Sequence, residues 1–336
     1  MVLNNWQYNA IQRDYDLKRS HNKRILKERE QEVFMKIPAL KELDDSLITY
    51  SVEAAKLSIM GDDSAIQTLK NRNEELSQCK KELLVSNGYP ADYLSPIYTC
   101  SDCKDTGYIN NEKCHCFKQA IVNMLFSQDT VREIIKDENF SKFRLGYYSK
   151  DIVNELTGLT PYDNMIRVLS ICKQYIENFS TDYQNLLIYG NAGVGKTFLA
   201  NSIANELINR AVTVIYLTSY QLFDILEKNK FQRSNEQYSK QEQQLNEDFI
   251  YESDLLIIDD LGTEFNNTFV TSQLYNCINE RHLKKKSTII STNLSPEELL
   301  ATYSERISSR LIGNYTLLNI YGDDIRFTKH LQDRKI

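Results

Sequence analysis

Short apolar runs alternate with helical stripes throughout the second half of the chain. Each run is suited to a buried strand, because a strand covered on both faces is almost continuously hydrophobic. The runs lie at residues 185–189, 212–217, 254–258, 287–291 and 316–320. The segments between them have helical spacing, and residues 197–209 place their apolar side chains on one stripe. This alternation predicts an α/β fold with a five-stranded parallel sheet that binds its ligand at the carboxyl ends of the strands.

The first part of the chain has a different pattern, which is helical and highly charged. Residues 13–32 are dense in Lys, Arg and Glu, and residues 65–85 carry leucines and isoleucines at helical spacing. Asn87-Gly88 and Pro90 then end the pattern. We therefore expect a helical hairpin or small bundle over residues 1–90. Its charged faces are either solvated surfaces or a surface that docks a partner.

Four of the seven cysteines gather between these two parts. They are Cys100 and Cys103, in a C-x₂-C pair, and Cys114 and Cys116, in a C-x-C pair. Four thiolates drawn together by one hairpin suit a tetrahedral zinc site. Because four thiolates leave no open position, the zinc is expected to be structural and not catalytic. His115 could replace one thiolate, and a reduced loop without metal is the remaining alternative.

Length and composition narrow the class of protein. The 336 residues are enough for two domains, and 41% hydrophobic with 26% charged residues is typical of globular proteins. No apolar run approaches the roughly 20 residues of a membrane span, and residues 1–6 lack the apolar core of a signal peptide. We therefore expect a cytoplasmic protein. A net charge of −6 argues against bulk electrostatic binding to DNA, although a local basic groove remains compatible with it.

A complete P-loop, G-x-x-x-x-G-K-[ST], occupies residues 190–197, directly after the first apolar run. In that setting, loop N–H groups and a helix N-terminus cradle phosphate. Lys196 is expected to reach the β- and γ-phosphates, and the Thr197 hydroxyl to ligate Mg²⁺. The predicted nucleotide-binding residues are Gly190, Asn191, Ala192, Gly193, Val194, Gly195, Lys196, Thr197 and Phe198, together with Asp259.

Two acids follow the apolar run at residues 254–258, in the form of a Walker B motif. Asp259 is expected to hold Mg²⁺, directly or through water, and Asp260 to polarise the attacking water. Many ATPases of this type have Glu at the second position, and Asp260 is one methylene shorter. Glu264 is therefore a candidate supplement, or otherwise a charge at a helix N-terminus.

Further polar groups follow later strands. Asn293, at the tip of the strand expected beside the two acids, can bond the γ-phosphate or the water, or can simply be a turn residue. Arg306 and Arg310 share one face of a short helix, which suits the phosphate of a nucleotide bound to a neighbouring subunit; surface salt bridges are the alternative. Arg326 is expected to reach the phosphates within its own subunit.

The order of these motifs resembles that of the AAA+ ATPases of the bacterial helicase-loader family, DnaC and DnaI. The motifs are the P-loop, the Asp-Asp pair, the strand-tip Asn, S-x-R-x-x-S-R and a late Gly-x-Asp-x-Arg. The resemblance covers residues 138–330, and the cysteine segment is similar to the N-terminal domain of the Gram-positive loaders. It implies an AAA+ P-loop NTPase core without a separate lid, preceded by a mainly helical zinc-binding domain. The predicted limits are residues 1–130 for the helical domain, 131–160 for a linker and 161–336 for the AAA+ domain.

The resemblance also implies roles and partners. It assigns Lys196 and Thr197 to Walker A, Asp259 and Asp260 to Walker B, Asn293 to sensor 1, Arg310 with its neighbour Arg306 to the arginine finger, and Arg326 to sensor 2. The implied cofactors are ATP, Mg²⁺ and structural Zn²⁺. The implied protein binds the hexameric, DnaB-type replicative helicase through its N-terminal domain, self-assembles through its AAA+ domains and loads the helicase onto single-stranded DNA. It is expected to hydrolyse ATP slowly when alone and to have no membrane partner.

Other functions remain open. An IstB-like transposition helper shares the same core, and a nucleotide-switched adaptor with negligible hydrolysis is compatible with Asp260. A DNA-binding zinc regulator fits less well, because the composition is acidic. Residues 284–286, a lysine triplet, and residues 232–248 are candidates for DNA contact, although a solvated charge run is the commoner meaning of such a triplet.

Overall fold

A computed structural model describes residues 5–59, 64–125, 129–231 and 247–327. The chain divides into two compact units, Asn9–Glu112 and a larger one made of Met1–Tyr8 with Lys113–Ile336. Most of the candidate DNA-contacting segment 232–248 lies outside the described residues. Among the described residues, every helix is too short or too polar to cross a membrane.

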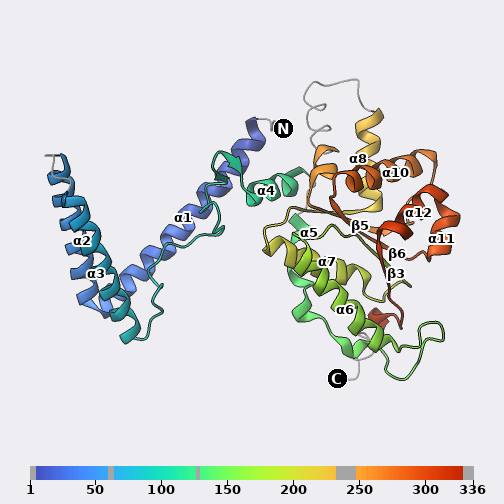
Figure 1. The fold of residues 1–336 in the computed structure, drawn as a ribbon, viewed down its shortest axis with the longest axis horizontal. Coiled ribbons are helices and arrows are strands. Elements are labelled where there is room, and N and C mark those ends of the chain that lie inside the picture. The colour runs from blue at the N-terminus through green and yellow to red at the C-terminus, as the bar shows by residue number, and fades with distance from the viewer. Residues whose placement is uncertain (1–4, 60–63, 126–128, 232–246, 328–336) are drawn as a thin grey trace. The chain divides into compact units, whose positions relative to one another are not determined.

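A single parallel sheet forms the centre of the larger unit (Figure 1). Its strands are β3 (Leu186–Tyr189), β4 (Val214–Thr218), β5 (Leu255–Leu261), β6 (Ser287–Thr292) and β7 (Thr316–Asn319), in the spatial order β4-β5-β6-β3-β7. Each lies where an apolar run predicted it, so the predicted five-stranded parallel α/β sheet is confirmed. The P-loop follows β3, which has β6 on one side and β7 on the other.

Helices cover both faces of this sheet (Figure 1). One face carries α6 (Pro161–Asn178) and α7 (Lys196–Asn209), and the other carries α8 (Ser219–Phe231) and α10 (Thr268–Leu283). The short helices α11 (Pro296–Thr302) and α12 (Glu305–Asn314) follow β6 and pack on each other. The apolar stripe predicted after the P-loop is buried in α7, where Leu199, Ile203 and Leu207 have no exposed surface.

The segment before α6 contributes to the same unit. It comprises α4 (His115–Leu125), α5 (Asp129–Asp137) and two 3₁₀ turns, η1 (Phe140–Lys142) and η2 (Leu145–Tyr147). From α4, the Gln119 side chain donates to the Val214 carbonyl at 3.1 Å and accepts from the Val214 N–H at 2.9 Å. These two bonds satisfy backbone groups on the outer edge of β4, where a bare strand would expose a pairing template.

The smaller unit is helical, as the charge pattern predicted. It contains most of α1 (Asn5–Lys36), the antiparallel pair α2 (Pro38–Ile59) and α3 (Ser64–Ser86), and a small hairpin, β1 (Tyr108–Ile109) with β2 (Glu112–Lys113). Pro38 opens α2 because a first-turn position requires no N–H donor. Val33, Leu40 and Leu84 are buried in a core where these three helices meet.

Candidate functional site

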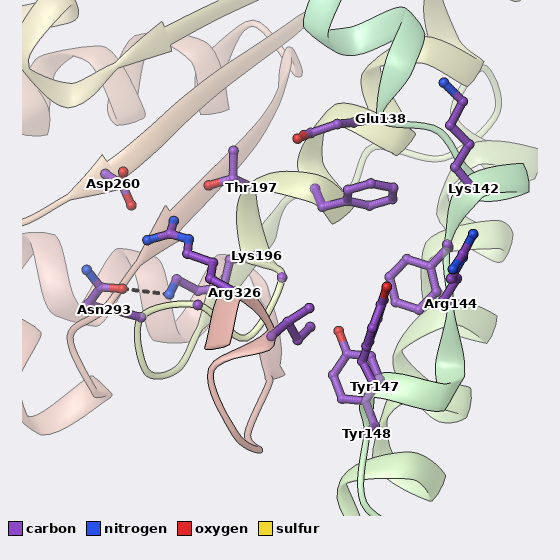
Figure 2. A pocket seen from close by; sticks show the side chains of 16 residues that line it. Glu138, Lys142, Arg144, Tyr147, Tyr148, Lys196, Thr197, Asp260, Asn293 and Arg326 are labelled. Carbon is purple, nitrogen blue, oxygen red and sulfur yellow. Dashed lines mark hydrogen bonds between the residues drawn. The ribbon is translucent and has the colours of Figure 1, made fainter. Parts of the chain in front are cut away.

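One pocket of about 360 Å³ lies at the carboxyl edge of the sheet (Figure 2). It gathers nine of the site residues predicted from the sequence with the aromatic and charged segment that precedes α6. Its lining is Glu138, Lys142, Phe143, Arg144, Tyr147, Tyr148, Ala192, Gly193, Gly195, Lys196, Thr197, Phe198, Asp260, Asn293, Ile325 and Arg326. Residues from five separate parts of the chain therefore form one cavity.

The P-loop backbone depends on glycine at defined positions. Gly190, Gly193 and Gly195 have φ values of 146°, 77° and 98°, which side chains other than glycine rarely adopt. A Cβ on Gly193 would lie 2.0 Å from the Asp324 carboxylate, and one on Gly195 would lie 2.8 Å from the Tyr148 hydroxyl. The loop is thus packed closely from outside while its N–H groups and the start of α7 are available to phosphate.

Lys196 lies at the centre of the pocket and is held by oxygen atoms. Its Nζ donates to the Gly190 and Asn191 carbonyls at 2.9 and 2.7 Å and to Asn293 Oδ1 at 2.6 Å, the last bond being drawn in Figure 2. Burial lowers the pKa of Lys196, while Asp260 and Asp259 oppose that shift. Asn293 therefore lies where a phosphate held by Lys196 would also meet its amide.

Asp259, at the end of β5, is surrounded by hydroxyl groups. Its carboxylate accepts hydrogen bonds from Tyr216 at 2.6 Å, from Thr197 at 3.2 and 3.3 Å, and from Ser291. Hard oxygen ligands of this kind suit Mg²⁺, so the Thr197 hydroxyl and Asp259 fit the metal predicted from the sequence. Burial, followed by the charge of Asp259, raises the pKa of Tyr216, which therefore stays a neutral donor.

Asp260 owes its direction to an irregularity in β5. Successive side chains of a strand point to opposite faces, but the pairing of β5 with β6 shifts register between Ile258 and Leu261, and Asp260 has a φ of 55°. Its carboxylate consequently lines the pocket beside Lys196. Burial, and after it Asp259, raises the pKa of Asp260, while Lys196 and Arg326 oppose the increase.

The segment after β7 packs against the P-loop. Ile325 donates its N–H to the Gly193 carbonyl at 3.0 Å, and Arg326 lines the pocket. From the opposite side, the Tyr148 hydroxyl donates to the Val194 carbonyl at 2.9 Å. Arg326 thus lines the cavity of its own chain, and its contact with the phosphates stays a prediction.

Two predicted arginines lie elsewhere. Arg306 and Arg310 are on α12 and do not line this pocket. Arg310 packs over the Tyr275 ring, 5.2 Å from its centroid, and donates to the Tyr275 hydroxyl at 3.3 Å, while Arg306 is exposed. Glu264 is also outside the pocket, where it accepts from the Gly262 N–H at 2.9 Å and from the Tyr303 hydroxyl. These hydrogen bonds to Glu264 therefore stabilise the loop after β5.

The segment before α6 forms the mouth of the pocket. Phe143 stacks near Tyr148, with ring centroids 6.0 Å apart, and meets Phe198 edge-on at 5.8 Å. Glu138 accepts a hydrogen bond from Asn201 at 2.6 Å, one helical turn beyond Thr197. Members of this aromatic segment both line the pocket and pack against the hydrophobic core.

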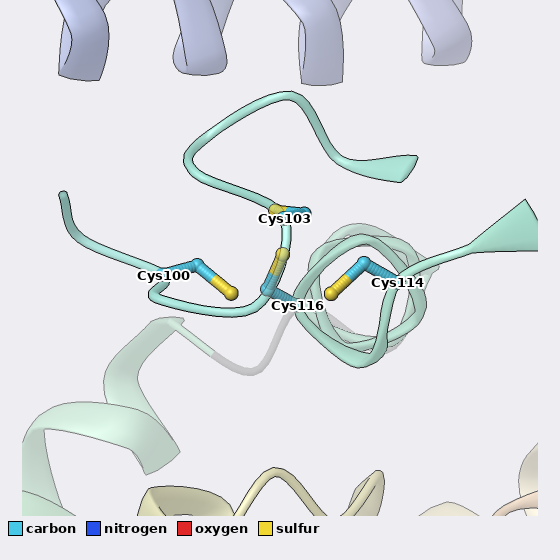
Figure 3. Close-up of side chains that lie close together, drawn as sticks. All are labelled: Cys100, Cys103, Cys114 and Cys116. Carbon is cyan, nitrogen blue, oxygen red and sulfur yellow. The ribbon is translucent and has the colours of Figure 1, made fainter. Parts of the chain in front are cut away.

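The four predicted cysteines form a compact cluster (Figure 3). The Sγ atoms of Cys100, Cys103, Cys114 and Cys116 all lie within 4.8 Å of one another, which suits the tetrahedral S₄ arrangement of zinc with its Zn–S bonds of about 2.3 Å. Nδ1 of His115 lies 3.3 Å from the Cys114 sulfur, so it is a neighbour of one ligand. The cluster is thus suited to a closed, structural site.

A buried carboxylate, which the sequence did not single out, supports the cysteine segment. Asp105 is 1% exposed and accepts hydrogen bonds from the Thr99 and Cys100 N–H groups, both at 2.8 Å. Asn22 of α1 also donates to it, at 3.0 Å. The loop that carries the first cysteine pair is therefore fixed to α1 by one acidic side chain.

The parallel sheet, the P-loop at the tip of its β3 strand and the acids at the tip of β5 define a P-loop ATP-binding protein of the AAA+ class. Residues 166–332 match the family model described as IstB-like ATP binding protein. Residues 166–332 therefore form an IstB/DnaC-like AAA+ domain.

Individual proteins show the same similarity. The replicative helicase loader DnaC of Escherichia coli K12 is 29% identical over 153 residues, which span 45% of this chain and 60% of that loader. The chromosomal replication initiator DnaA of Campylobacter fetus is 30% identical over 138 residues, 41% of this chain and 30% of the initiator. A crystal structure of the DnaC helicase loader covers 56% of this chain and 98% of its own, with 22% identity and a TM-score of 0.43.

Proposed function

We propose that this protein is an ATP-dependent loader that binds the hexameric replicative DNA helicase and helps to place it on single-stranded DNA during replication initiation or restart. The observation that carries the proposal is the pocket that brings the P-loop together with Asp260, Asn293 and Arg326 in an IstB/DnaC-like AAA+ domain. A relative that this domain resembles is itself named a replicative helicase loader. The match spans only 60% of that loader, so the remaining functions are part of the proposal.

Each site residue has a task in this cycle. Lys196 and the P-loop N–H groups bind the phosphates, and Thr197 and Asp259 hold the Mg²⁺, which neutralises phosphate charge when bound. Asp260 accepts a proton from, or orients, the attacking water, and Asn293 positions that water or the γ-phosphate. Arg326 stabilises the phosphates within its own subunit.

We propose that hydrolysis is completed by a neighbouring subunit. Arg310 and Arg306 lie outside the pocket of their own chain, on α12. An arginine supplied to a neighbour's nucleotide would explain why two cations occupy one face of that helix. Turnover would then be slow in an isolated subunit and would rise on self-assembly.

The helicase would bind the N-terminal region, residues 1–130, and residues 131–160 would link this region to the ATPase domain, 161–336, while also contributing to the mouth of its pocket. Two features support this assignment: a charged helical unit and a cysteine cluster suited to structural zinc. A structural zinc site gives a small unit a rigid surface without taking part in chemistry.

Two alternatives are retained. The family match to IstB-like proteins favours a transposition helper as the second candidate. A nucleotide-switched adaptor with negligible hydrolysis also fits, because Asp260 is a shorter base than the usual Glu.

The proposal is tested with the full-length chain and the replicative helicase of the same organism. We expect co-purification of the two proteins, and ATP-dependent unwinding of a forked DNA that is coated with single-strand-binding protein. Lys196→Ala should bind helicase but fail to support unwinding, whereas Lys173→Ala, which changes an exposed lysine of α6 outside the pocket, should behave as wild type. Absence of helicase binding would contradict the loader, and helicase-independent stimulation of DNA strand transfer would favour the transposition helper.

A further inference from the structure

The carboxylate of Asp259 is held from both sides by the two strands that flank its own. β5 lies between β4 and β6. Tyr216 of β4 donates to Oδ2 at 2.6 Å, and Ser291 of β6 donates to Oδ1. Each oxygen therefore has its own donor from a neighbouring strand, which fixes the rotation of the carboxylate about its final bond.

We propose that Tyr216 is a positioning residue that orients Asp259 toward the Mg²⁺ of the ATP site. This inference rests on the proposed ATPase function. This role could not be predicted from the sequence, because Tyr216 lies inside an apolar run and its ring suits the core of a sheet.

The location of Tyr216 makes its hydroxyl a fixed donor. The residue is 6% exposed and its ring packs in the core with Leu199 and Ile257 among its neighbours in the cluster. A ring in a close-packed core cannot swing away without opening a cavity. The register pairs Thr218, the last residue of β4, with Asp259. Tyr216 lies two residues earlier in β4, and its hydroxyl extends along the sheet to the Asp259 carboxylate.

Thr197 differs from the other two donors. Its hydroxyl lies 3.2 and 3.3 Å from the two Asp259 oxygens, and both distances are longer than the 2.6 Å hydrogen bond from Tyr216. Of the three, it is the one placed to turn toward a metal, as the P-loop threonine does in this class. When it turns, Tyr216 and Ser291 still hold the carboxylate in place.

Tyr216 can be tested separately from Ser291. Ser291 also accepts the Asp260 N–H at 3.0 Å, so its removal would disturb the irregular end of β5. The Tyr216 hydroxyl can be deleted as Tyr216→Phe, which leaves the ring in the core. Partners that orient metal ligands typically change metal affinity by about 10- to 100-fold when they are removed.

The matched control is Tyr175→Phe. Tyr175 is another buried tyrosine of the same core, 2% exposed, and among the described residues its hydroxyl has no carboxylate partner. Both variants delete one buried phenol oxygen, so a general effect on packing should appear in both. An effect through Asp259 should appear only in Tyr216→Phe.

The experiment measures metal and nucleotide binding separately. Binding of a fluorescent ATP analogue is followed in EDTA and during titration with Mg²⁺, and Mn²⁺ bound in the presence of ATP is counted by electron paramagnetic resonance. We expect Tyr216→Phe to bind Mn²⁺ about ten-fold more weakly and to need correspondingly more Mg²⁺. Its affinity for the analogue in EDTA should match that of wild type, and its melting temperature that of Tyr175→Phe.

Metal affinity within two-fold of wild type would overturn the inference, as would an equal loss of nucleotide binding with and without metal. Failure of the proposed function has a different signature, because the wild-type protein itself would then show no metal-dependent binding of ATP.

Discussion

Replacement of Gly190 by alanine tests the account of how the P-loop is packed. A Cβ at this position would lie 1.9 Å from the Ile320 carbonyl oxygen and 2.9 Å from its carbon. These are backbone atoms at the end of β7, and the Ile320 N–H is itself bonded to the Tyr189 carbonyl at 2.8 Å. The new atom therefore cannot be accommodated by turning a side chain.

Two costs add at this site. Overpacking against rigid neighbours costs about 1–3 kcal/mol, and forcing a side chain into an unfavourable backbone region costs about 1–3 kcal/mol more. We therefore expect Gly190→Ala to lose about 3–5 kcal/mol of folding free energy, a large part of the roughly 5–15 kcal/mol that stabilises a protein. For a domain of this size, about 2–4 °C per kcal/mol converts this loss to a fall in melting temperature near 10 °C.

Two other glycines separate the two costs. Gly158 has a φ of 67° but open space around it, so Gly158→Ala should cost only the backbone strain of about 1–2 kcal/mol. Gly313, near the end of α12, has neither a positive φ nor a close neighbour, so Gly313→Ala should stabilise by up to about 1 kcal/mol.

The assay is thermal unfolding of the nucleotide-free protein, with binding of a fluorescent ATP analogue as a second measurement. The expected order of melting temperature is Gly313→Ala above wild type, then Gly158→Ala, then Gly190→Ala, and only the last should lose nucleotide binding. If Gly190→Ala melts within 2 °C of Gly158→Ala, the end of β7 yields easily and the reasoning from close packing is refuted.

Four further outcomes can be measured on the same protein. Metal analysis should find about one zinc per chain in wild type and in Cys79→Ser but little in Cys103→Ser; equal zinc in both variants would exclude the cluster as the site. Asp105→Asn should release zinc to a chromogenic chelator several-fold faster, because the two N–H groups lose a charged acceptor, and an unchanged rate would contradict that role. The raised pKa of Asp260 moves the acid limb of ATP turnover above the usual range of Asp, since the carboxylate must lose its proton to act as a base. For the same reason Asp260→Asn should abolish turnover yet stabilise the ATP-free protein at neutral pH, where the buried charge is costly; wild-type turnover in this variant would exclude Asp260 as the base.

Much of the fold could be predicted because hydrophobic periodicity indicates where the strands and helices lie in the sequence. The strand β3 was expected at 185–189 and is observed at Leu186–Tyr189, and the helical stripe expected over 197–209 is observed in α7, Lys196–Asn209. The hairpin between the cysteine pairs was harder to place. Its reversal is at Asn110-Asn111, whose φ values of 48° and 67° suit a two-residue loop.

The candidate site could be predicted only as far as its motifs extend. Lys196, Asp260, Asn293 and Arg326 were found from spacing, and all four line one pocket. Tyr216 could not be found in this way, because a tyrosine within an apolar run has the pattern of a core residue.

Long-range contacts limited the prediction in a second way. The proximity of Tyr148 to the P-loop depends on the folding of the segment before α6, and the packing of Arg310 on Tyr275 depends on how α12 lies against α10. Neither contact leaves a periodic signal, since each joins residues that are far apart in the chain.

The position of β3 in the sheet has a consequence for the order in which the domain folds during its synthesis on the ribosome. Leu186 pairs with Ile289 on one side and with Thr316 on the other, so both partners of the P-loop strand are synthesised long after it. Contacts of such sequence separation form late and slowly. A nascent chain that has exposed its P-loop but not yet residues 316–326 therefore lacks one wall of the cradle, and competence to hold nucleotide is among the last properties that the domain acquires during synthesis.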